Sequence, residues 1–319
     1  MNLNKPLLAI LTIIALSIAS LFVGVANINL ESLLAGDARA IEILVSSRIP
    51  RLFAIGLAGA GLSVAGLIMQ QIVQNRFAAP STTGTIDCAM LGYIVTLVFF
   101  AQVDNWLQLT IIMAFSVFGT LLFVRFIQRM QFKSAMLVPL IGIMYGNVVS
   151  SLTIFVAYKY DLVQTLNSWT VANFASVLKG NYELLYLAIP TSILAYMYAS
   201  RFNAASIGES FAKNIGLNYR RIVMIGVMLV AVLSSSVVMI VGVIPFLGLI
   251  VPNIVSQFMG DNMRRNLPWT AYWGALLVLI CDVIGRIIIF PYEVPISMII
   301  SVFGGVIFIA LILKDKSNA

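Results

Sequence analysis

The chain has 319 residues, of which 61% are hydrophobic and only 10% are charged. Soluble domains carry about 25% charged residues, so this composition excludes a water-soluble protein and indicates one that crosses a membrane many times. The 19 basic residues are spread singly and give a net charge of +7, which argues against a nucleic-acid-binding patch, and the sequence has no histidine to ligate a metal.

Hydropathy predicts about ten membrane-spanning helices, because roughly 20 apolar residues cross the core of a bilayer. The first apolar run follows Lys5, and its length and the lack of a clear cleavage site favour a retained span over a signal peptide. No soluble domain interrupts the spans, so residues 1–319 are expected to form a single all-α polytopic membrane domain. The predicted spans are 7–26, 52–73, 84–101, 107–127, 135–157, 183–200, 219–241, 244–260, 268–290 and 295–313.

The second span begins just after Arg48 and Arg51 and contains about two dozen residues without a charge. Glycine, alanine and serine recur along it at three- and four-residue spacing, and such small residues let neighbouring membrane helices approach closely. A helix that faces only lipid would not need this face. We therefore expect the span to pack inside a helix bundle and to carry function at its two ends.

The basic residues predict the orientation of the chain. With the N-terminus in the cytoplasm, 13 of the 19 lysines and arginines fall in cytoplasmic loops and 6 fall outside, so both termini are predicted to be cytoplasmic. Arg48, Arg51 and Arg286 are exceptions on the outer face. They either reach from a helix end towards water, or they pair with carboxylates of a protein that docks from outside.

Residues 206–216 predict a short amphipathic helix on the cytoplasmic side. Ser206 and Glu209 have the spacing of a capping box, and Gly216 suits the left-handed end of a helix. Three apolar residues recur every four positions and form one stripe. The helix either lies on the membrane surface or fits a groove on a cytoplasmic partner. The residues assigned to it are Ser206, Ile207, Gly208, Glu209, Phe211, Ile215 and Gly216.

The sequence contains no Gly-Lys pair and therefore no Walker A loop, so any ATP hydrolysis must come from another polypeptide.

Asp87 is the main ionisable group within the predicted spans. We expect its side chain to make a polar contact between helices, and we favour this role over a proton relay. Asp282 and Arg286 have the spacing of an i,i+4 ion pair. Residues 242–253, which end in Asn253, contain two prolines and two glycines, so they line a pathway or pack against other protein.

Several segments, in order over essentially the whole chain, resemble the permease family of iron-siderophore and vitamin B12 ABC importers, the type II importers. The matching segments are Arg48–Leu52, Gly66–Gln70, Asn75–Pro80, Gly208–Gly216, Phe246–Pro252, Arg264–Arg265, Gly274–Asp282 with Arg286, Glu293–Ile296 and Gly304–Gly305. The variants Asn253 and Ser81–Asp87 resemble a subgroup that imports ferric catechol-type siderophores such as petrobactin, anguibactin, vibriobactin or enterobactin.

The resemblance implies the type II ABC importer permease fold, with ten helices per subunit, in the bacterial inner membrane. It also implies a second, related permease subunit in a heterodimer, two cytoplasmic ATPases that bind ATP and Mg²⁺, and a periplasmic or lipid-anchored siderophore-binding protein. The permease itself would bind no cofactor and no metal. Carried onto this sequence, Arg48, Arg51 and Arg286 would contact the binding protein, residues 206–216 would form the coupling helix, and Asn75 and Phe77 would lie near the cytoplasmic gate.

The sequence therefore predicts a permease subunit that passes an intact ferric siderophore inward without covalent chemistry. Its cavity should bind the cargo weakly, because a tightly held substrate would not leave on the far side. Two alternatives stay open. In the first, the chain is an ion-coupled secondary transporter that acts alone. In the second, it is a type II importer permease for haem or a corrinoid.

Overall fold

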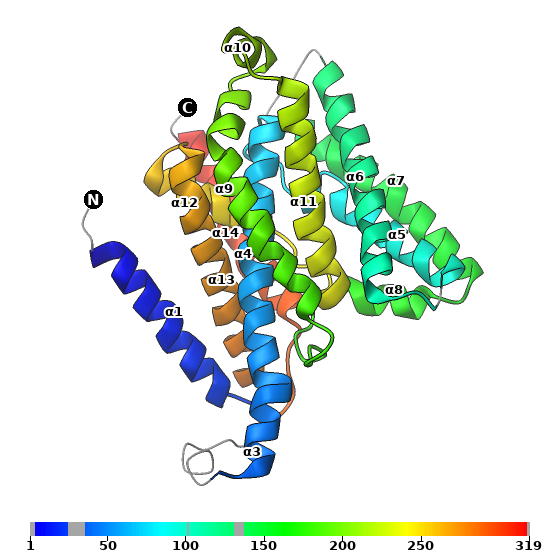
Figure 1. Ribbon diagram of the computed structural model, residues 1–319, viewed down its shortest axis with the longest axis vertical. Coiled ribbons are helices and arrows are strands. Elements are labelled where there is room, and N and C mark those ends of the chain that lie inside the picture. The colour runs from blue at the N-terminus through cyan, green and yellow to red at the C-terminus, as the bar shows by residue number, and fades with distance from the viewer. Residues whose placement is uncertain (1–3, 25–35, 101, 131–136, 318–319) are drawn as a thin grey trace.

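The computed structural model describes residues 4–24, 36–100, 102–130 and 137–317. Within these residues the chain consists of helices joined by turns and loops (Figure 1). The long helices are α1 (Asn4–Phe22), α4 (Ile49–Val73), α5 (Thr85–Phe99), α6 (Asn105–Arg129), α7 (Leu137–Lys159), α9 (Ala188–Ala205), α11 (Tyr219–Val241), α12 (Leu247–Met259), α13 (Met263–Ile287) and α14 (Ile296–Ser317). The short ones are α3 (Ala38–Ile43), α8 (Val163–Thr170) and α10 (Glu209–Asn214), with a π-helix at Leu44–Arg48 and 3-10 helices at Pro80–Thr82 and Glu183–Leu187.

Each predicted span corresponds to one of the long helices, which confirms the all-α membrane architecture. Among the described residues, five segments are both long and apolar enough to cross a bilayer: Ala38–Val73, Asn105–Arg129, Leu137–Lys159, Tyr219–Val241 and Met263–Ile287. The first of these is longer than predicted, because the helix already begins at Ala38 and passes through both arginines. Their side chains do not end the helix, since they pair with groups of the same chain.

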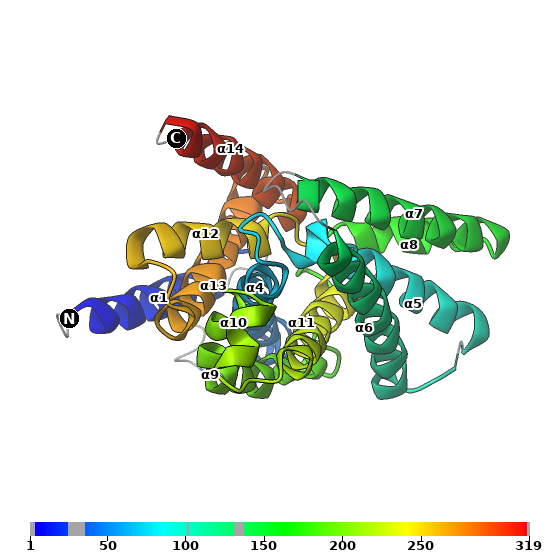
Figure 2. The same cartoon turned by 90° about the horizontal axis from the view of Figure 1, so that it is seen from above.

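Helix α4 lies at the centre of the bundle, surrounded by α9, α11, α12 and α13 (Figure 2). Two of its glycines allow this close packing. A methyl group at Gly59 would lie 2.6 Å from the carbonyl oxygen of Gly274 in α13, and one at Gly66 would overlap the backbone of Gly248 in α12. Residues with side chains cannot approach so closely, so the small-residue packing predicted for this span is confirmed.

Helices α5, α6, α7 and α8 form a second group on the other side of α11 from α13 (Figure 2). Helix α1 lies apart from this group and contacts α13 and α4. The outward faces of α1, α7 and α14 carry large exposed apolar side chains, such as Phe155 in α7 and Val302 in α14. Such continuous apolar faces are suited to lipid or to another membrane subunit.

The helical structure is interrupted between α11 and α12, at residues 242–246. Gly242 and Phe246 have positive φ angles of 96° and 60°, which end one helix and start the next. Backbone groups freed by this interruption pair with the end of α8 and the segment after it: Val243 N–H donates to the carbonyl of Trp169 at 3.3 Å, and Asn173 N–H donates to the carbonyl of Val241 at 3.0 Å. Irregular backbone at membrane depth requires such partners.

The two ends of the bundle differ in charge. Helix α10 lies at one end and α3 at the other; α1 runs towards the α3 end and α14 runs away from it (Figure 1). Both ends of the described chain therefore point to the side of α10, as the loop charges predict. That side carries Arg76, Arg201, Lys213 and Arg265, so we call it the cytoplasmic end and the α3 side the outer end.

Candidate functional site

Five charged side chains converge at the outer end, and we call them the outer arginine cluster: Arg48, Arg51, Asp282, Arg286 and Glu293. Arg51 Nη2 lies 2.8 Å from Asp282 Oδ1 and 2.9 Å from Glu293 Oε2. Arg286 Nη2 lies 2.6 Å from Asp282 Oδ2, which confirms the predicted i,i+4 pair. The side chains of Asp282 and Arg286 are each only 2% exposed. One buried carboxylate therefore binds two guanidinium groups.

The same arginines hold the end of α1. Arg286 Nη1 donates hydrogen bonds to the carbonyl oxygens of Ser20, at 2.9 Å, and Val23, at 2.7 Å. Arg48 Nη1 also donates to the carbonyl of Val23. The last carbonyl groups of a helix have no partner within the helix, and arginine side chains satisfy them well. The cluster thus connects α1 to α4 and α13.

The three arginines predicted to contact a docking protein lie together at the outer end, but they are largely buried in contacts with their own chain. Glu293 is the most accessible partner, with 28% of its side chain exposed. A docking role for Arg48, Arg51 and Arg286 stays a prediction. Sequence reasoning did not single out Glu293 as a site residue, because 242 positions separate it from Arg51 and the fold alone brings them together.

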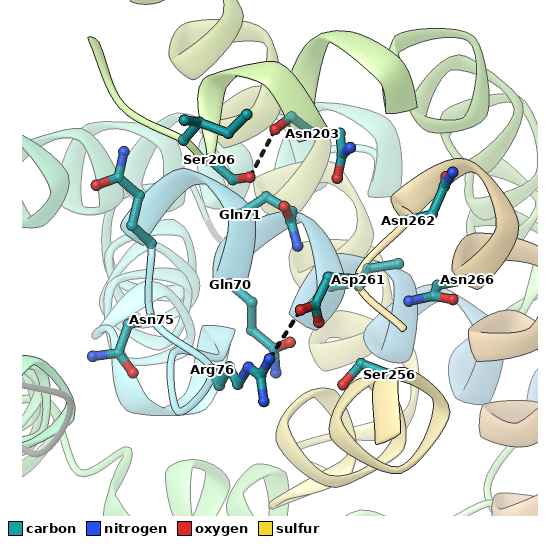
Figure 3. Close-up of a pocket in the computed structure, with 13 residues that line it drawn as sticks. Gln70, Gln71, Asn75, Arg76, Asn203, Ser206, Ser256, Asp261, Asn262 and Asn266 are labelled. Carbon is teal, nitrogen blue, oxygen red and sulfur yellow. Dashed lines mark hydrogen bonds and ion pairs between the residues drawn. The ribbon is translucent and has the colours of Figure 1, made fainter. Parts of the chain in front are cut away.

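A cavity of about 530 Å³ opens at the cytoplasmic end, and we call it the cytoplasmic cavity (Figure 3). It lies between the end of α4, the α9–α10 connection and the start of α13. Most of its lining side chains are amides or hydroxyls, so it is suited to water and to weak polar contacts. The lining residues are Leu67, Gln70, Gln71, Gln74, Asn75, Arg76, Asn203, Ser206, Ile207, Ser256, Asp261, Asn262 and Asn266.

The predicted gate residues Asn75 and Phe77 lie in the loop after α4, residues 74–79, which we call the gate loop. This loop forms part of the wall of the cavity. Asn75 Oδ1 accepts a hydrogen bond from the backbone N–H of Phe77 at 2.8 Å, which fixes the turn. The ring of Phe77 meets the ring of Phe308 in α14 edge-to-face, with 5.9 Å between their centroids. The loop therefore rests on α14, and an aromatic contact of this kind contributes about 0.5–1.5 kcal/mol beyond burial.

Two further contacts hold the same loop through Arg76, which sequence reasoning did not select. The Arg76 guanidinium lies 3.0 Å from Asp261 Oδ2 at the mouth of the cavity (Figure 3), and both side chains are exposed. Asn253 Nδ2 donates to the backbone carbonyl of Arg76 at 2.8 Å. Asn253 therefore packs against this loop, and this explains why a polar residue stands in the middle of an apolar helix.

Two buried amides line the cavity without full hydrogen bonding. Gln70 and Asn266 are 7% and 1% exposed. Within the part of the chain that the structure describes, Gln70 Nε2 and Asn266 Oδ1 have no hydrogen-bond partner, although Asn266 Nδ2 donates to the carbonyl of Gly260 at 2.5 Å. Buried polar atoms are costly unless paired, so the wall of the cavity contains hydrogen-bonding groups that the surrounding side chains do not use.

The predicted cytoplasmic helix is present but begins later than predicted. Helix α10 starts after Gly208, and Ser206 belongs to the end of α9, where its hydroxyl donates to the carbonyl of Asn203 at 2.8 Å. The predicted capping box with Glu209 is therefore wrong: Glu209 lies in the first turn, where a carboxylate suits the helix dipole. Gly216 has the expected left-handed φ, 78°.

The apolar stripe of this segment is confirmed as a surface feature. Ile207, Phe211 and Ile215 are 63%, 40% and 50% exposed, and an ion pair of 2.8 Å between Lys213 and Glu209 stabilises the helix. Phe211 in this short helix, with Ile207 before it and Ile215 just after it, exposes a large apolar surface that is costly in water, so these side chains favour a contact with another molecule.

The last predicted site residue, Asp87, lies in the first turn of α5 and lines a second cavity of about 240 Å³ between α5, α7 and α8. Across the described ranges, no three histidine, cysteine, aspartate or glutamate side chains come together as metal ligands would. The two ends of the bundle and this second cavity therefore contain the polar groups that are available for function.

Three relatives with known roles match nearly the whole chain. The petrobactin import system permease protein YclN of Bacillus subtilis is 44% identical over 307 residues, which cover 96% of this chain and 97% of the relative. The petrobactin import system permease protein FatD of Bacillus anthracis is 40% identical over 314 residues, 98% of this chain and 92% of the relative. The ferric-anguibactin transport system permease protein FatD of Vibrio anguillarum is 38% identical over 305 residues, 96% of this chain and 97% of the relative.

A solved structure has the same fold. An inward-facing metal-chelate type ABC transporter superposes with a TM-score of 0.79 at 25% identity, covering 96% of this chain and 97% of the other. Together with the apolar helices, this makes the chain a multi-pass protein of the bacterial inner membrane. The model of the FecCD transport family matches residues 7–314. The chain belongs to the FecCD transport family.

Proposed function

We propose that this chain is the permease subunit of an ATP-driven importer that carries a ferric siderophore of the catechol type across the inner membrane. The observation that carries the proposal is the position of α10. Its apolar stripe is exposed at the cytoplasmic end, directly beside a polar cavity that reaches into the bundle. An ATPase that holds this stripe can transmit its movement to the wall of the cavity. The petrobactin and anguibactin permeases among the relatives support the cargo class.

The ATPase contact follows from the chain around α10. Ser206 and Ile207 line the cavity and join α9 to α10 without a flexible linker, because Gly208 N–H donates to the carbonyl of Ala205 at 3.1 Å. A displacement of α10 by the closing ATPases therefore moves one wall of the cavity. We propose two ATPase subunits, which bind ATP and Mg²⁺, while this chain binds no cofactor.

Cargo leaves past the gate loop. The loop is held by one aromatic contact, one amide hydrogen bond and the exposed Arg76–Asp261 ion pair. Each of these contacts is weak: an exposed ion pair contributes about 0–1 kcal/mol and an aromatic contact about 0.5–1.5 kcal/mol. We therefore expect the free-energy cost of opening the loop to be small enough for the ATPases to supply. We propose that Asn75 and Phe77 move with it. The polar lining then offers the cargo many weak contacts and no tight one.

At the outer end we propose that a siderophore-binding protein, periplasmic or lipid-anchored, docks on the outer arginine cluster. Arg51 already binds Glu293, the most exposed member of the cluster. A carboxylate of the docking protein therefore takes the exposed side of Arg51 in competition with Glu293, while Arg48 and Arg286 keep α1 in place from behind. Complementary charge of this kind mainly guides association.

A second permease subunit completes the path. The outward apolar face of α14 is continuous with the gate loop through Phe77 and Phe308, so a partner packed there would cover the loop. We propose a related but distinct subunit, hence a heterodimer, surrounded by membrane lipid.

The test is uptake by the complete transporter in proteoliposomes, with binding protein and a ferric catecholate in the outer compartment and ATP inside. Uptake that requires ATP and stops with an ATPase lacking its catalytic lysine supports the proposal. Uptake by this chain alone on a proton or sodium gradient would show a secondary transporter. Transport of haem or a corrinoid, but no ferric catecholate, would refute the cargo class.

A further inference from the structure

The cavity around Asp87 lies between α5, α7 and α8; six of its eleven lining residues are polar, although apolar atoms form the larger part of its surface. Three helices and the turn before α5 contribute to it, and its volume is about 240 Å³. Polar and ionisable residues at membrane depth usually face a pathway or a site, because burying them against lipid is costly. The polar lining residues are Ser81, Asp87, Ser150, Thr153, Asn167 and Thr170.

Two glycines make room for the Asp87 carboxylate. Gly84 caps α5 with a left-handed φ of 73°, which turns the chain so that Asp87 falls in the first turn of the helix. A methyl group at Gly146 in α7 would lie 2.6 Å from Asp87 Oδ2, so the carboxylate rests directly against the backbone of α7. The acid is thus held in a fixed place at the cavity.

Among the described residues, the Asp87 carboxylate has no partner of opposite charge. Within the described residues no lysine or arginine pairs with it, and its own backbone N–H is its hydrogen-bond donor. The dipole of α5 favours a negative charge in the first turn, and this explains why an aspartate is tolerated there. The dipole does not explain why polar side chains of α7 and α8 line the same cavity as the Asp87 carboxylate.

The neighbouring hydroxyls present acceptors to the cavity. Thr153 Oγ1 donates its hydrogen to the carbonyl of Val149 at 2.9 Å, and Thr170 Oγ1 donates to the carbonyl of Asn167 at 2.8 Å. Each hydroxyl hydrogen is therefore used on its own helix, and the oxygen lone pairs remain. A carboxylate that shares a cavity with such acceptor oxygens is complementary to a cation with several hydrogen-bond donors.

We propose that this cavity binds a protonated amine of the cargo as it passes through the permease. An ammonium group carries one positive charge and up to three donors, which match one carboxylate and the threonine oxygens. Sites for whole drug-sized ligands measure about 300–1,000 Å³, so this smaller cavity admits one substituent of a chelate and not the whole chelate. The proposal rests on the proposed import function and adds a cargo-selective residue to it.

The experiment compares two ferric catecholates that differ in one feature: one has free amines in its linker, and in the other these amines are acetylated. Uptake of each is measured with the complete transporter in proteoliposomes, and each variant's rate is divided by the wild-type rate for the same cargo. Asp87→Asn removes the charge at nearly constant shape, and Thr153→Val removes one acceptor. Asp161→Asn, an exposed acid at a left-handed position that asparagine tolerates, is the matched control.

Charge-assisted hydrogen bonds predict that Asp87→Asn lowers uptake of the amine cargo about tenfold and leaves the acetylated cargo within about twofold. Thr153→Val should lower the same uptake less, and the control should change neither. Equal loss for both cargoes, or no loss, overturns the proposal while import itself stands. Sodium dependence of both uptakes that disappears in Asp87→Asn would assign the cavity to a sodium ion and also overturn it. Failure of wild-type uptake would instead refute the import function.

Discussion

Asp282 is expected to be the residue on which the outer end depends most, and Asp282→Ala tests this. The substitution leaves Arg51 and Arg286 without the carboxylate that lies 2.8 Å and 2.6 Å from them. Removing one partner of a buried ion pair costs about 3–5 kcal/mol, because the remaining charge is uncompensated. Here two guanidinium groups lose their carboxylate; Arg51 retains a second one, Glu293, whereas Arg286 retains, within the described residues, only uncharged acceptors on α1 and the residue after it. We therefore expect the upper part of that range.

The assay is thermal unfolding of the purified chain in lipid nanodiscs, followed by intrinsic tryptophan fluorescence. For a domain of this size, 1 kcal/mol shifts the midpoint by about 2–4 °C, so Asp282→Ala should lower it by about 10 °C. Glu293→Gln is the matched control. Its side chain is 28% exposed, and a partly exposed pair contributes about 1 kcal/mol or less, so its midpoint should fall by at most about 4 °C. Equal shifts for the two variants would refute the assignment of Asp282 as the centre of the cluster.

Three further predictions concern the packing, the gate and the ATPase contact. Gly66→Val should prevent stable folding, because even a methyl group there overlaps the backbone of Gly248; a normal gel-filtration profile would contradict this. Asp261→Asn should change the unfolding midpoint by less than about 3 °C, since its pair with Arg76 is exposed, yet raise basal ATPase activity of the complete transporter by releasing the gate loop. Phe211→Asp should abolish co-purification with the ATPase, whereas unchanged co-purification would show that α10 is not the contact.

The periodic and compositional features of the sequence were sufficient to predict most of the fold. The spans, the internal pair of Asp282 and Arg286, and the small-residue face of α4 all follow from residues near one another in the chain, although the helices packed on that face could not be named. Local spacing was misleading at one site: Ser206 and Glu209 have capping-box spacing, but the positive φ of Gly208 starts α10 two residues later. Capping patterns describe one turn and do not reveal where the previous helix ends.

The contacts that sequence could not supply join distant positions. Glu293 reaches Arg51 across 242 positions, and Asn253 reaches the carbonyl of Arg76 across 177. No periodicity connects such residues, since their distance depends on how the helices pack. The arginines of the outer end show the consequence. The sequence predicted that these arginines lie at the outer end of the bundle. It did not predict that they are buried against α1 and Asp282, because that depends on how the helices pack.

Helices α4 and α13 join the two ends of the molecule, and their packing determines which parts can move. At the outer end Arg51 of α4 is paired with Asp282 of α13; at the cytoplasmic end Gln70 of α4 and Asn266 of α13 line one cavity. Between these levels Gly59 meets the backbone of Gly274 so closely that sliding would cause overlap. A pair fixed by a buried ion pair and by backbone contact behaves as one rigid body. If the proposed import function holds, movement between outward and inward states is therefore expected around this pair, in α10, the gate loop and the group formed by α5, α6, α7 and α8.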